Sequence, residues 1–360
     1  MGLAEPLIAQ TFYEAVAKAV DEGLSTNTII LVQPSSPYVC IGFHQEIERE
    51  VNIEYCRSRS LPIIRRSQGG GTVYLDSNQI FYQVIARGES KAIPLSVERL
   101  FETFLSVTVY VYRQLGLSAE FKALNDVTVD GKKISGNGAG KFGENTTILV
   151  GNVILDLDYD SMAGVLKVTS EKFRDKMAKS MREWVTSLRR ELDYIPPVEE
   201  VKRLLVEGYE QTLGIKLVKS EATETEKKIW KEEVKPRHLS RDWLYMPELR
   251  HEGLIEGRAV KIAGGVKVAE IDYKAKKLIR VRAELVGTRI LDVMISGDFF
   301  IVPEEALTDL KSSLKGSILD RDEVLSRVRG FYRKSGAQTP GITPEDFTDA
   351  IMKLMNLAET

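Results

Sequence analysis

Hydrophobic residues at the start of the chain follow two different spacings. Between residues 8 and 20, Ile, Phe, Ala and Val recur every three or four positions, which predicts an amphipathic helix ending at Gly23. The β-branched run at residues 28–32 predicts a buried strand, and residues 38–42 predict a second strand. Asn52 is expected to cap a short helix after them.

The middle of the chain combines further strands with longer helices. Residues 96–116 have the spacing of a long amphipathic helix, and further helices are expected up to about residue 213. Asp130-Gly131 is typical of a tight hairpin turn. The strands predicted in this middle part are residues 62–66, 79–86, 126–129, 132–135 and 146–157. A glycine-rich turn is expected between the first two of them, residues 62–66 and 79–86.

The character of the chain changes after residue 215. Residues 216–257 mix acidic and basic side chains densely, which is typical of a solvated helix or a linker. Strand patterns then return, and helices are expected after Pro303 and at the caps Asp320 and Thr343. The strands expected here are residues 260–262, 266–273, 278–284 and 290–296.

The order of these elements indicates an α+β protein, because strands and helices do not alternate as they do in a parallel βαβ sheet. We expect a mixed, largely antiparallel sheet with flanking helices, followed by a small α+β C-terminal domain. The predicted parts are a domain at residues 1–215, a charged linker or connecting helix at 216–257, and a small domain at 258–360.

Composition and charge exclude several classes of protein. The 360 residues carry 50 Lys and Arg against 52 Asp and Glu, so no overall basic field attracts nucleic acid. Neither a signal-peptide pattern nor an apolar run of membrane-spanning length is present, so we expect a cytoplasmic protein without a membrane partner. Two cysteines cannot form a disulfide framework, and three scattered histidines make a structural metal site unexpected.

The strongest local signal is the run Arg65-Arg66-Ser67-Gln68-Gly69-Gly70-Gly71-Thr72-Val73-Tyr74-Leu75-Asp76. Three adjacent glycines cost backbone entropy, and a connection between strands seldom needs three. They make sense where a ligand must contact the main chain, because no Cβ blocks its approach. The two preceding arginines can hold an anion bidentately. A flexible hairpin tip with solvated arginines is the alternative that this run leaves open.

A second candidate site lies on the predicted hairpin. Lys133 occupies a strand position before the small residues Ser135 and Gly136, so its side chain can point into a site. Asn125 and Asp126 supply the amide and carboxylate oxygens that suit Mg²⁺. An exposed hairpin is the alternative, because Asp-Gly-Lys-Lys is common in such turns.

The glycine-rich stretch at residues 136–141, which we expect to form a loop, invites two motif assignments that its spacing rejects. A P-loop would need Gly in place of Ser135 and Ser or Thr in place of Phe142. A dinucleotide fingerprint would need its third glycine one residue later and a helix after it. Backbone N–H groups of such a loop can still hold phosphate.

Three other side chains are weaker candidates for chemistry. Cys40 lies within a predicted strand and is expected to be a core thiol. Cys56 lies near Arg57 and Arg59, which can lower a thiol pKa, but no catalytic role is expected for either cysteine. His44 stands at a strand end, where it can reach a pocket or serve a structural role.

Taken in order, these segments resemble the lipoate–protein ligase A family, within the wider biotin/lipoate ligase fold. The glycine-rich run is the most specific part, and Ile41-Gly42 with Gln45 looks like the family strand that precedes it. Asn125-Asp126, residues 133–136 and residues 183–188 are similar to later family segments. The match covers about residues 1–215. Gly264-Gly265-Val266 and residues 297–303 are similar to the small accessory domain of these ligases, fused here.

The resemblance implies an enzyme that activates lipoate or octanoate with ATP and Mg²⁺ and transfers the acyl group to a protein lysine. Lys133 would be the catalytic residue, contacting the carboxyl end of the acid and the α-phosphate. Asn125 and Asp126 would place phosphate and Mg²⁺. The residues expected to bind the substrate and adenylate are Arg65, Ser67, Gly69, Gly70, Gly71, Thr72, Val73, Tyr74, Asp76, Ser135 and Gly136.

The implied partner is a lipoyl-acceptor protein, for which a lipoyl domain, a glycine-cleavage-type carrier and a dedicated lipoate-binding carrier all stay open. The sequence departs from the family pattern at Leu75, where the family usually has His. After the segment at residues 133–136 the family usually reads Ser-Ala and later shows a His-Gly pair, whereas this chain has Asn-Gly-Ala-Gly at residues 137–140 and Val150-Gly151.

Three other functions are alternatives to the ligase. A non-catalytic or regulatory lipoyl-binding protein on the same fold is the first. An octanoyl or lipoyl transferase is the second, but related transferases use a cysteine downstream of the lysine segment, and none follows Cys56. A biotin ligase would need an adenylate loop of different spacing.

Overall fold

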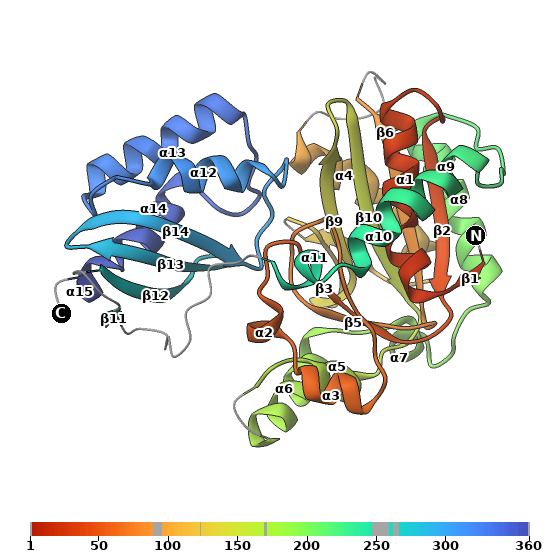
Figure 1. The fold of residues 1–360 in the computed structure, drawn as a ribbon. Helices are drawn as coiled ribbons and strands as arrows, with labels where there is room; N and C mark the ends of the chain where they lie inside the picture. The colour runs from red at the N-terminus through yellow and green to blue at the C-terminus, as the bar shows by residue number, and fades with distance from the viewer. Residues whose placement is uncertain are drawn as a thin grey trace. The chain divides into compact units, whose positions relative to one another are not determined.

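The computed structural model describes residues 2–88, 96–122, 124–168, 171–246, 259–261 and 266–358 (Figure 1). Its contacts divide the chain into two compact units. The first comprises Met1–Ile41, Glu48–Arg66 and Thr72–Leu244, and the second comprises Gly42–Ile47, Ser67–Gly71 and Tyr245–Thr360. Two short loops from early in the chain therefore fold with the C-terminal part.

Within the described residues, a seven-stranded mixed sheet forms the centre of the first unit, in the order β1-β2-β6-β10-β9-β8-β7. Only the pairing of β1 with β2 is parallel; the other pairs are antiparallel, which confirms the predicted fold class. The strands are β1 (Leu3–Ala4), β2 (Thr28–Pro34), β6 (Gln79–Arg87), β7 (Ala119–Lys122), β8 (Asp126–Val129), β9 (Lys132–Phe142) and β10 (Thr146–Ile154).

A three-stranded sheet in the order β4-β3-β5 carries the glycine-rich sequence. Strand β3 (Tyr38–Ile41) pairs parallel with β4 (Ile63–Arg65) and antiparallel with β5 (Val73–Leu75). Strand β5 was not predicted, because three residues are too few to show an alternation. Since β3 and β4 are parallel, their C-terminal ends lie at the same end of this sheet, and the loops Gly42–Ile47 and Ser67–Gly71 both begin there.

Long helices pack on the seven-stranded sheet because each presents one apolar face. Helix α1 (Pro6–Asp21) buries Phe12, Val16 and Val20 at the predicted spacing and contacts β6. Helix α4 (Val97–Gln114) packs against α8 (Val198–Leu213). The other helices in this part of the chain are α2 (Ile47–Glu50), α3 (Ile53–Ser58), α5 (Tyr159–Val165), α6 (Glu171–Trp184) and α7 (Leu188–Leu192).

Two local predictions about β-structure met different outcomes. The Asp130-Gly131 turn is confirmed, since both residues have positive φ, 49° and 76°, as a two-residue hairpin turn of this kind requires. The loop expected at residues 136–141 is wrong, because these residues continue β9 and pair with β10. Pairing with β10 from Asn137 onward engages backbone groups on one side of β9 that a loop would have offered to phosphate.

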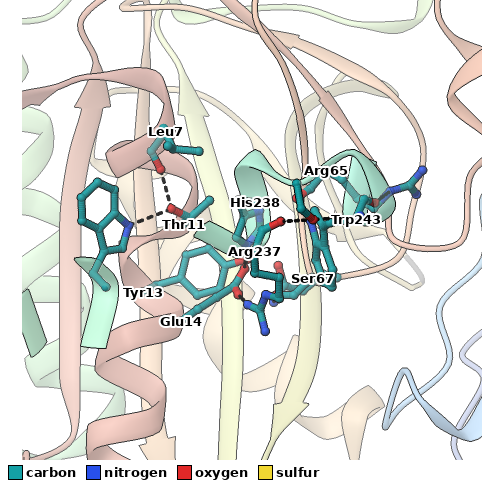
Figure 2. Close-up of polar contacts among 12 residues, drawn as sticks. Leu7, Thr11, Tyr13, Glu14, Arg65, Ser67, Arg237, His238 and Trp243 are labelled. Atoms are coloured by element: carbon teal, nitrogen blue, oxygen red, sulfur yellow. Dashed lines mark hydrogen bonds and ion pairs between the residues drawn. The ribbon is translucent and has the colours of Figure 1, made fainter. Parts of the chain in front are cut away.

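The charged segment that we predicted as a connection has no regular structure at residues 216–223, is helical from Glu224 to Tyr245, and belongs to the first unit up to Leu244. It forms α9 (Glu224–Ile229), η1 (Trp230–Val234), α10 (Lys235–Leu239) and α11 (Arg241–Tyr245). The indole of Trp230 donates to Thr11 Oγ1 of α1 at 2.9 Å. The carboxylate of Glu14, fully buried on α1, is bound by Arg237 and by His238 Nε2, the latter at 3.0 Å (Figure 2).

The second unit has a four-stranded antiparallel sheet among its described residues, in the order β11-β12-β13-β14. Helices cover it through an apolar core that includes Ile279, Val281, Leu310 and Phe347. Gly264 and Gly265 lie outside the described residues. The elements are β11 (Ala259–Lys261), β12 (Val266–Lys274), β13 (Leu278–Val286), β14 (Arg289–Gly297), α12 (Ala306–Leu314), α13 (Arg321–Ser335), α14 (Pro344–Met352) and α15 (Met355–Ala358).

The predicted helix caps at Asn52, Asp320 and Thr343 are confirmed by side-chain hydrogen bonds to the first turn of each helix. Among the described helices, none combines the length and the apolar character needed to cross a bilayer.

Candidate functional site

The hairpin of β8 and β9 brings the predicted lysine and carboxylate together. Lys133 Nζ lies 2.6 Å from Asp126 Oδ1, and the two side chains keep 38% and 33% of their surface exposed. Both side chains are therefore partly open to solvent, while Asp126 Oδ1 itself is buried within the pair. The pair supplies a cation whose position is set by the protein, which is what stabilisation of a developing negative charge needs.

A β-bulge fixes the backbone at Lys133. Val127 pairs with Ser135, whereas the next residue, Thr128, pairs with Lys133, so Ile134 is the extra residue and is fully buried. The carbonyl of Lys133 accepts a hydrogen bond from the N–H of Thr186 at 2.8 Å. This contact gives a physical role to the segment at residues 183–188, for which the sequence suggested only a resemblance.

The absence of a side chain at Gly136 makes room for the lysine. A Cβ at this position would lie 3.2 Å from Cε and 3.3 Å from Nζ of Lys133. The chain of Lys133 therefore crosses directly over Gly136, and any larger residue would displace the ammonium group by a few tenths of an ångström. The glycine predicted beside the lysine thus has a steric reason.

A buried polar cluster lies beneath this hairpin. Tyr82 OH accepts from Thr108 Oγ1 at 2.8 Å and donates to Asn137 Oδ1. Asn137 Nδ2 in turn donates to the carbonyl of Asn125 at 3.0 Å. Burial raises the pKa of Tyr82 to about 12, so its hydroxyl stays protonated and acts as a donor. Asn125, which precedes β8 and was predicted to bind phosphate and Mg²⁺, is therefore hydrogen-bonded to Asn137 of β9.

Hydrogen bonds connect the hairpin to the strand that carries Val73 and Tyr74. The N–H of Gly136 donates to Asn152 Oδ1 at 3.0 Å, and Asn152 Nδ2 donates to Gln79 Oε1 at 2.7 Å. Gln79 Nε2 then reaches the carbonyl of Tyr74 at 3.4 Å. Sequence reasoning did not select Asn152 or Gln79, although both are polar residues inside strands and so depart from an apolar pattern.

Replacing Asn152 with Ala is expected to lower the free energy of unfolding by about 1–2 kcal/mol, because the Gly136 N–H and the Gln79 amide lose their partner. Urea unfolding of both proteins measures this loss. Gln211→Ala, at an exposed amide on α8, is the control and is expected to change stability by less than about 0.5 kcal/mol. Equal stability of native protein and Asn152→Ala would contradict the role of this bridge.

The residues predicted after the glycine run are mostly buried. Thr72, Tyr74 and Asp76 expose less than a tenth of their surface, while Val73 is half-buried. Asp76 Oδ1 accepts from the N–H of Asn78 at 2.9 Å, and burial raises the pKa of this carboxyl. Burial also raises the pKa of Tyr74 to about 12. These side chains shape β5 and its turn, and their contact with a ligand stays a prediction.

The two arginines before the glycine run have different surroundings. Arg65 is fully buried, and its guanidinium donates to the carbonyls of Trp243 and Leu244, both at 2.9 Å, at the end of the charged segment (Figure 2). Trp243 Nε1 returns a hydrogen bond to the carbonyl of Arg65 at 3.1 Å. Arg66 is half-buried and donates to Cys40 Sγ at 3.5 Å. We selected Arg65, whereas Arg66 is the arginine with the more exposed side chain.

The glycine run folds with the second unit, together with Ser67. A Cβ on Gly69 would lie 2.4 Å from the carbonyl oxygen of Phe299, so protein packing alone requires glycine there. Gly70 has a φ of 94°, in the region that favours glycine. A Cβ on Gly71 would meet nothing within 4 Å. Gly71 therefore has open space where a ligand can approach, whereas Gly69 does not.

Both cysteines are buried, at 1% exposure each. Burial raises the pKa of the Cys40 thiol and raises that of Cys56 to about 11, so neither is a thiolate near neutral pH. The expected core role of Cys40 agrees with this placement.

The ring of His44 stacks on Phe299 with centroids 5.2 Å apart and borders a cavity of about 190 Å³ lined also by Phe43, Glu304 and Lys311.

Comparison with known proteins gives the family. The family model described as the lipoyl protein ligase A/B catalytic domain matches residues 5–210. The chain is 31% identical over 215 residues to lipoate-protein ligase A subunit 1 of Thermoplasma acidophilum, covering 57% of this chain and 79% of that protein. It is 27% identical over 328 residues to lipoate-protein ligase LplJ of Bacillus subtilis, covering 89% of this chain and 90% of that protein.

The chain is also similar to octanoyltransferases. Octanoyltransferase LipM of Halalkalibacterium halodurans is 26% identical over 265 residues, covering 67% of this chain and 95% of that protein. The relatives therefore include enzymes that ligate lipoate to proteins and enzymes that transfer octanoyl groups.

Solved structures share the fold. A bipartite lipoate protein ligase from Thermoplasma acidophilum, studied with its E2 lipoyl domain, has a TM-score of 0.59 and 28% identity, covering 69% of this chain and 98% of that one. A lipoate-protein ligase A bound with ATP has a TM-score of 0.55 and 23% identity, covering 65% and 93%. With the sheet, the lysine hairpin and the family match over more than half of its length, the chain belongs to the lipoyl protein ligase A/B catalytic domain family.

Proposed function

We propose that the protein is an ATP-dependent lipoate–protein ligase, which activates lipoate or octanoate and transfers the acyl group to a lysine of an acceptor protein. The observation that supports this most directly is the Lys133 ammonium, held by Asp126 at 2.6 Å and crossing over Gly136. The Lys133 side chain keeps 38% of its surface exposed, and the carbonyl of Lys133 accepts a hydrogen bond from the N–H of Thr186.

In the proposed reaction a carboxylate oxygen of the acid attacks the α-phosphorus of ATP, and pyrophosphate leaves. The ε-amine of the acceptor lysine then attacks the acyl carbon, AMP leaves, and the amine loses a proton. Neither step needs a nucleophile from this chain, so positioning and charge stabilisation are sufficient. Lys133 would stabilise the charge on the phosphoryl oxygens in the first step and on the oxyanion in the second.

Mg²⁺ would accompany ATP and neutralise part of its phosphate charge. Asp126 offers carboxylate oxygens of the type that Mg²⁺ prefers, and a third of its side chain is exposed. Asn125 is a weaker candidate than we expected, because its side-chain nitrogen donates to the carbonyl of Asn137 and only 7% of its surface is exposed. We therefore propose Asp126 as the residue that meets the metal–nucleotide complex.

The alternative reaction, octanoyl transfer through a thioester, has less support in this chain. Such a transfer needs an accessible thiolate that attacks the incoming acyl group. The only cysteines, Cys40 and Cys56, are buried with raised thiol pKa values. Activation with ATP needs no thiol, so the ligase reaction is the one these residues favour.

The acceptor that we propose is a lipoyl domain. The Thermoplasma acidophilum ligase, which is similar to this chain over its first part, was studied with its E2 lipoyl domain. A glycine-cleavage-type carrier and a dedicated lipoate-binding carrier are the other acceptors to be tried beside it.

The proposal is tested by incubating the purified protein with lipoate, ATP and Mg²⁺ and detecting lipoyl-adenylate by mass spectrometry, with octanoate and biotin in parallel. We expect an adenylate with lipoate or octanoate, and the same yield from Cys40→Ala/Cys56→Ala. Folded native protein that forms no adenylate from any of these acids would sink the ligase proposal. Acyl transfer from an acyl carrier protein without ATP, abolished in the double variant, would establish the transferase instead.

A further inference from the structure

The second unit contains a charged sheet face that is buried. On β12 and β13, Glu270 stands opposite Arg282, and Asp272 stands opposite Arg280. Arg280 and Arg282 each expose only 7% of their surface, and Glu270 exposes none. The neighbouring residues Ile271, Ile279 and Val281 point into the apolar core under the helices. A face this rich in charge is normally solvated, so another part of the unit must cover it.

The loop Gly42–Ile47 covers this face through one side chain. Glu46 Oε1 accepts from Ser296 Oγ at 2.6 Å, and Glu46 Oε2 accepts from Arg282 Nη2 at 3.1 Å. Arg280 Nη1 lies 3.7 Å from Glu46 Oε1. The carboxylate of Glu46, itself 12% exposed, thus meets three partners on two strands. Charge-assisted hydrogen bonds shielded from water are among the stronger polar contacts in a protein.

The same end of β14 also holds the rest of this loop. The N–H of Gly297 donates to the carbonyl of His44 at 3.1 Å, and the His44 ring stacks on Phe299 at an interplanar angle of 13°. Glu46 and His44 therefore hold the loop Gly42–Ile47 against this sheet at two points.

The glycine run is attached to the same structure. The N–H of Gly70 donates to the carbonyl of Phe299 at 3.3 Å, and Gly69 packs against that carbonyl. The N–H of Phe43 donates to the carbonyl of Gln68 at 2.9 Å, which joins the two loops directly. Whatever fixes Gly42–Ile47 therefore also limits the movement of Ser67–Gly71.

We infer that Glu46 is a positioning residue, which fixes the glycine-rich run through its contacts with Arg280, Arg282 and Ser296. Glu46 acts through the two loops and does not itself touch the substrate. The consequence of Glu46 for catalysis rests on the proposed function and on the predicted binding of the acyl-adenylate by the glycine run. Loss of the Glu46 charge leaves the two arginines paired with Glu270 and Asp272, so the sheet stays folded while the loops loosen.

The test compares Glu46→Gln with Asp272→Asn, a matched control. Both substitutions turn a carboxylate partner of these arginines into an amide, but Asp272 lies on β12 and pairs with Arg280, whereas Glu46 belongs to the loop Gly42–Ile47 itself. Amide hydrogen exchange is measured by mass spectrometry over Gly42–Ile47 and Ser67–Gly71. We expect exchange about tenfold faster in both loops of Glu46→Gln and unchanged exchange in Asp272→Asn.

Kinetics of adenylate formation give the second readout. Glu46→Gln is expected to raise KM for the acid about tenfold and to leave kcat within about twofold, because binding weakens while the Lys133 chemistry is untouched. Glu46→Asp, which keeps the charge on a shorter chain, is expected to recover part of the affinity. Ser296→Ala removes one partner of Glu46 without altering the charges and is expected to loosen both loops as well, so the inference stays testable if Glu46→Gln fails to fold.

Hydrogen exchange in the loops tests the role of Glu46, whereas adenylate formation by the native protein tests the proposed function. Unchanged loop exchange in folded Glu46→Gln would overturn the inference whatever the activity, and so would equally faster exchange in Asp272→Asn. Faster exchange in Glu46→Gln and Ser296→Ala alone supports the inference even if native protein forms no adenylate, a result that would count against the proposed ligase activity only.

Discussion

Replacement of Lys133 with Ala is expected to lower the rate of acyl-adenylate formation about 100- to 1,000-fold, the range found when one preorganised charge-stabilising donor is removed. The reason is the placement of this ammonium, 2.6 Å from Asp126 and packed over Gly136 on a bulged strand. The carbonyl of Lys133 also accepts a hydrogen bond from the N–H of Thr186, which fixes the backbone that carries this side chain. Single-turnover adenylate formation, followed by mass spectrometry, measures the loss.

Lys132 provides the matched control for this substitution. It precedes Lys133, has 36% side-chain exposure and lies 3.8 Å from Glu191 Oε1. Lys132→Ala removes the same charge from the same strand, and we expect a change in rate of less than about threefold, since successive strand residues point to opposite faces and Lys132 lies near Glu191 and not near Asp126. Thermal unfolding of both variants excludes loss of fold. Equal rates for native protein and Lys133→Ala would remove Lys133 from the proposed chemistry.

Changing each glycine of the run to Ala is expected to lower the stability of the protein at Gly69 and Gly70, and to test ligand binding at Gly71. Gly69→Ala places a Cβ 2.4 Å from the backbone oxygen of Phe299, and we expect a loss of about 1–3 kcal/mol in the free energy of unfolding of the second unit. Gly70→Ala adds strain of about 1 kcal/mol or more at a φ of 94°. Urea unfolding monitored by fluorescence measures both losses.

Gly71→Ala is the informative member of this series. Its added methyl group meets no atom within 4 Å, so stability is expected to change by less than about 0.5 kcal/mol. A rise in KM for the acid or for ATP in this variant would place the ligand beside Gly71. Native stability together with native KM values would show that the open space at Gly71 is not used, and the ligand contacts proposed for the run would have to be reassigned.

Much of the fold follows from local signals in the sequence. The amphipathic spacing of α1 and α4 and the helix caps at Asn52, Asp320 and Thr343 depend on neighbours a few residues away, and all are present. The extension of β9 through a run of glycines could not be predicted in this way. Its pairing with β10 is a tertiary property that overrides the low strand propensity of glycine.

The candidate site shows the same division. Lys133, Asp126 and Gly136 lie close together because a two-residue turn places them on one hairpin, a relation that the sequence spacing contains. Sequence alone did not reveal that Arg65 is buried beneath the end of α11, or that Gly69 faces the backbone of Phe299. Both contacts join residues more than 170 positions apart, and no local pattern encodes them.

The buried carboxylate of Glu14 has a consequence for how the protein is made. Its partner His238 lies 224 residues later in the chain, and Arg237 stands beside it. While a ribosome is still synthesising the intervening residues, α1 carries an acidic group on the face that must become buried, and an uncompensated charge opposes that burial. Native packing of the first helix must therefore wait until α10 has emerged, so the first unit completes its folding as a whole and not progressively from its N-terminus.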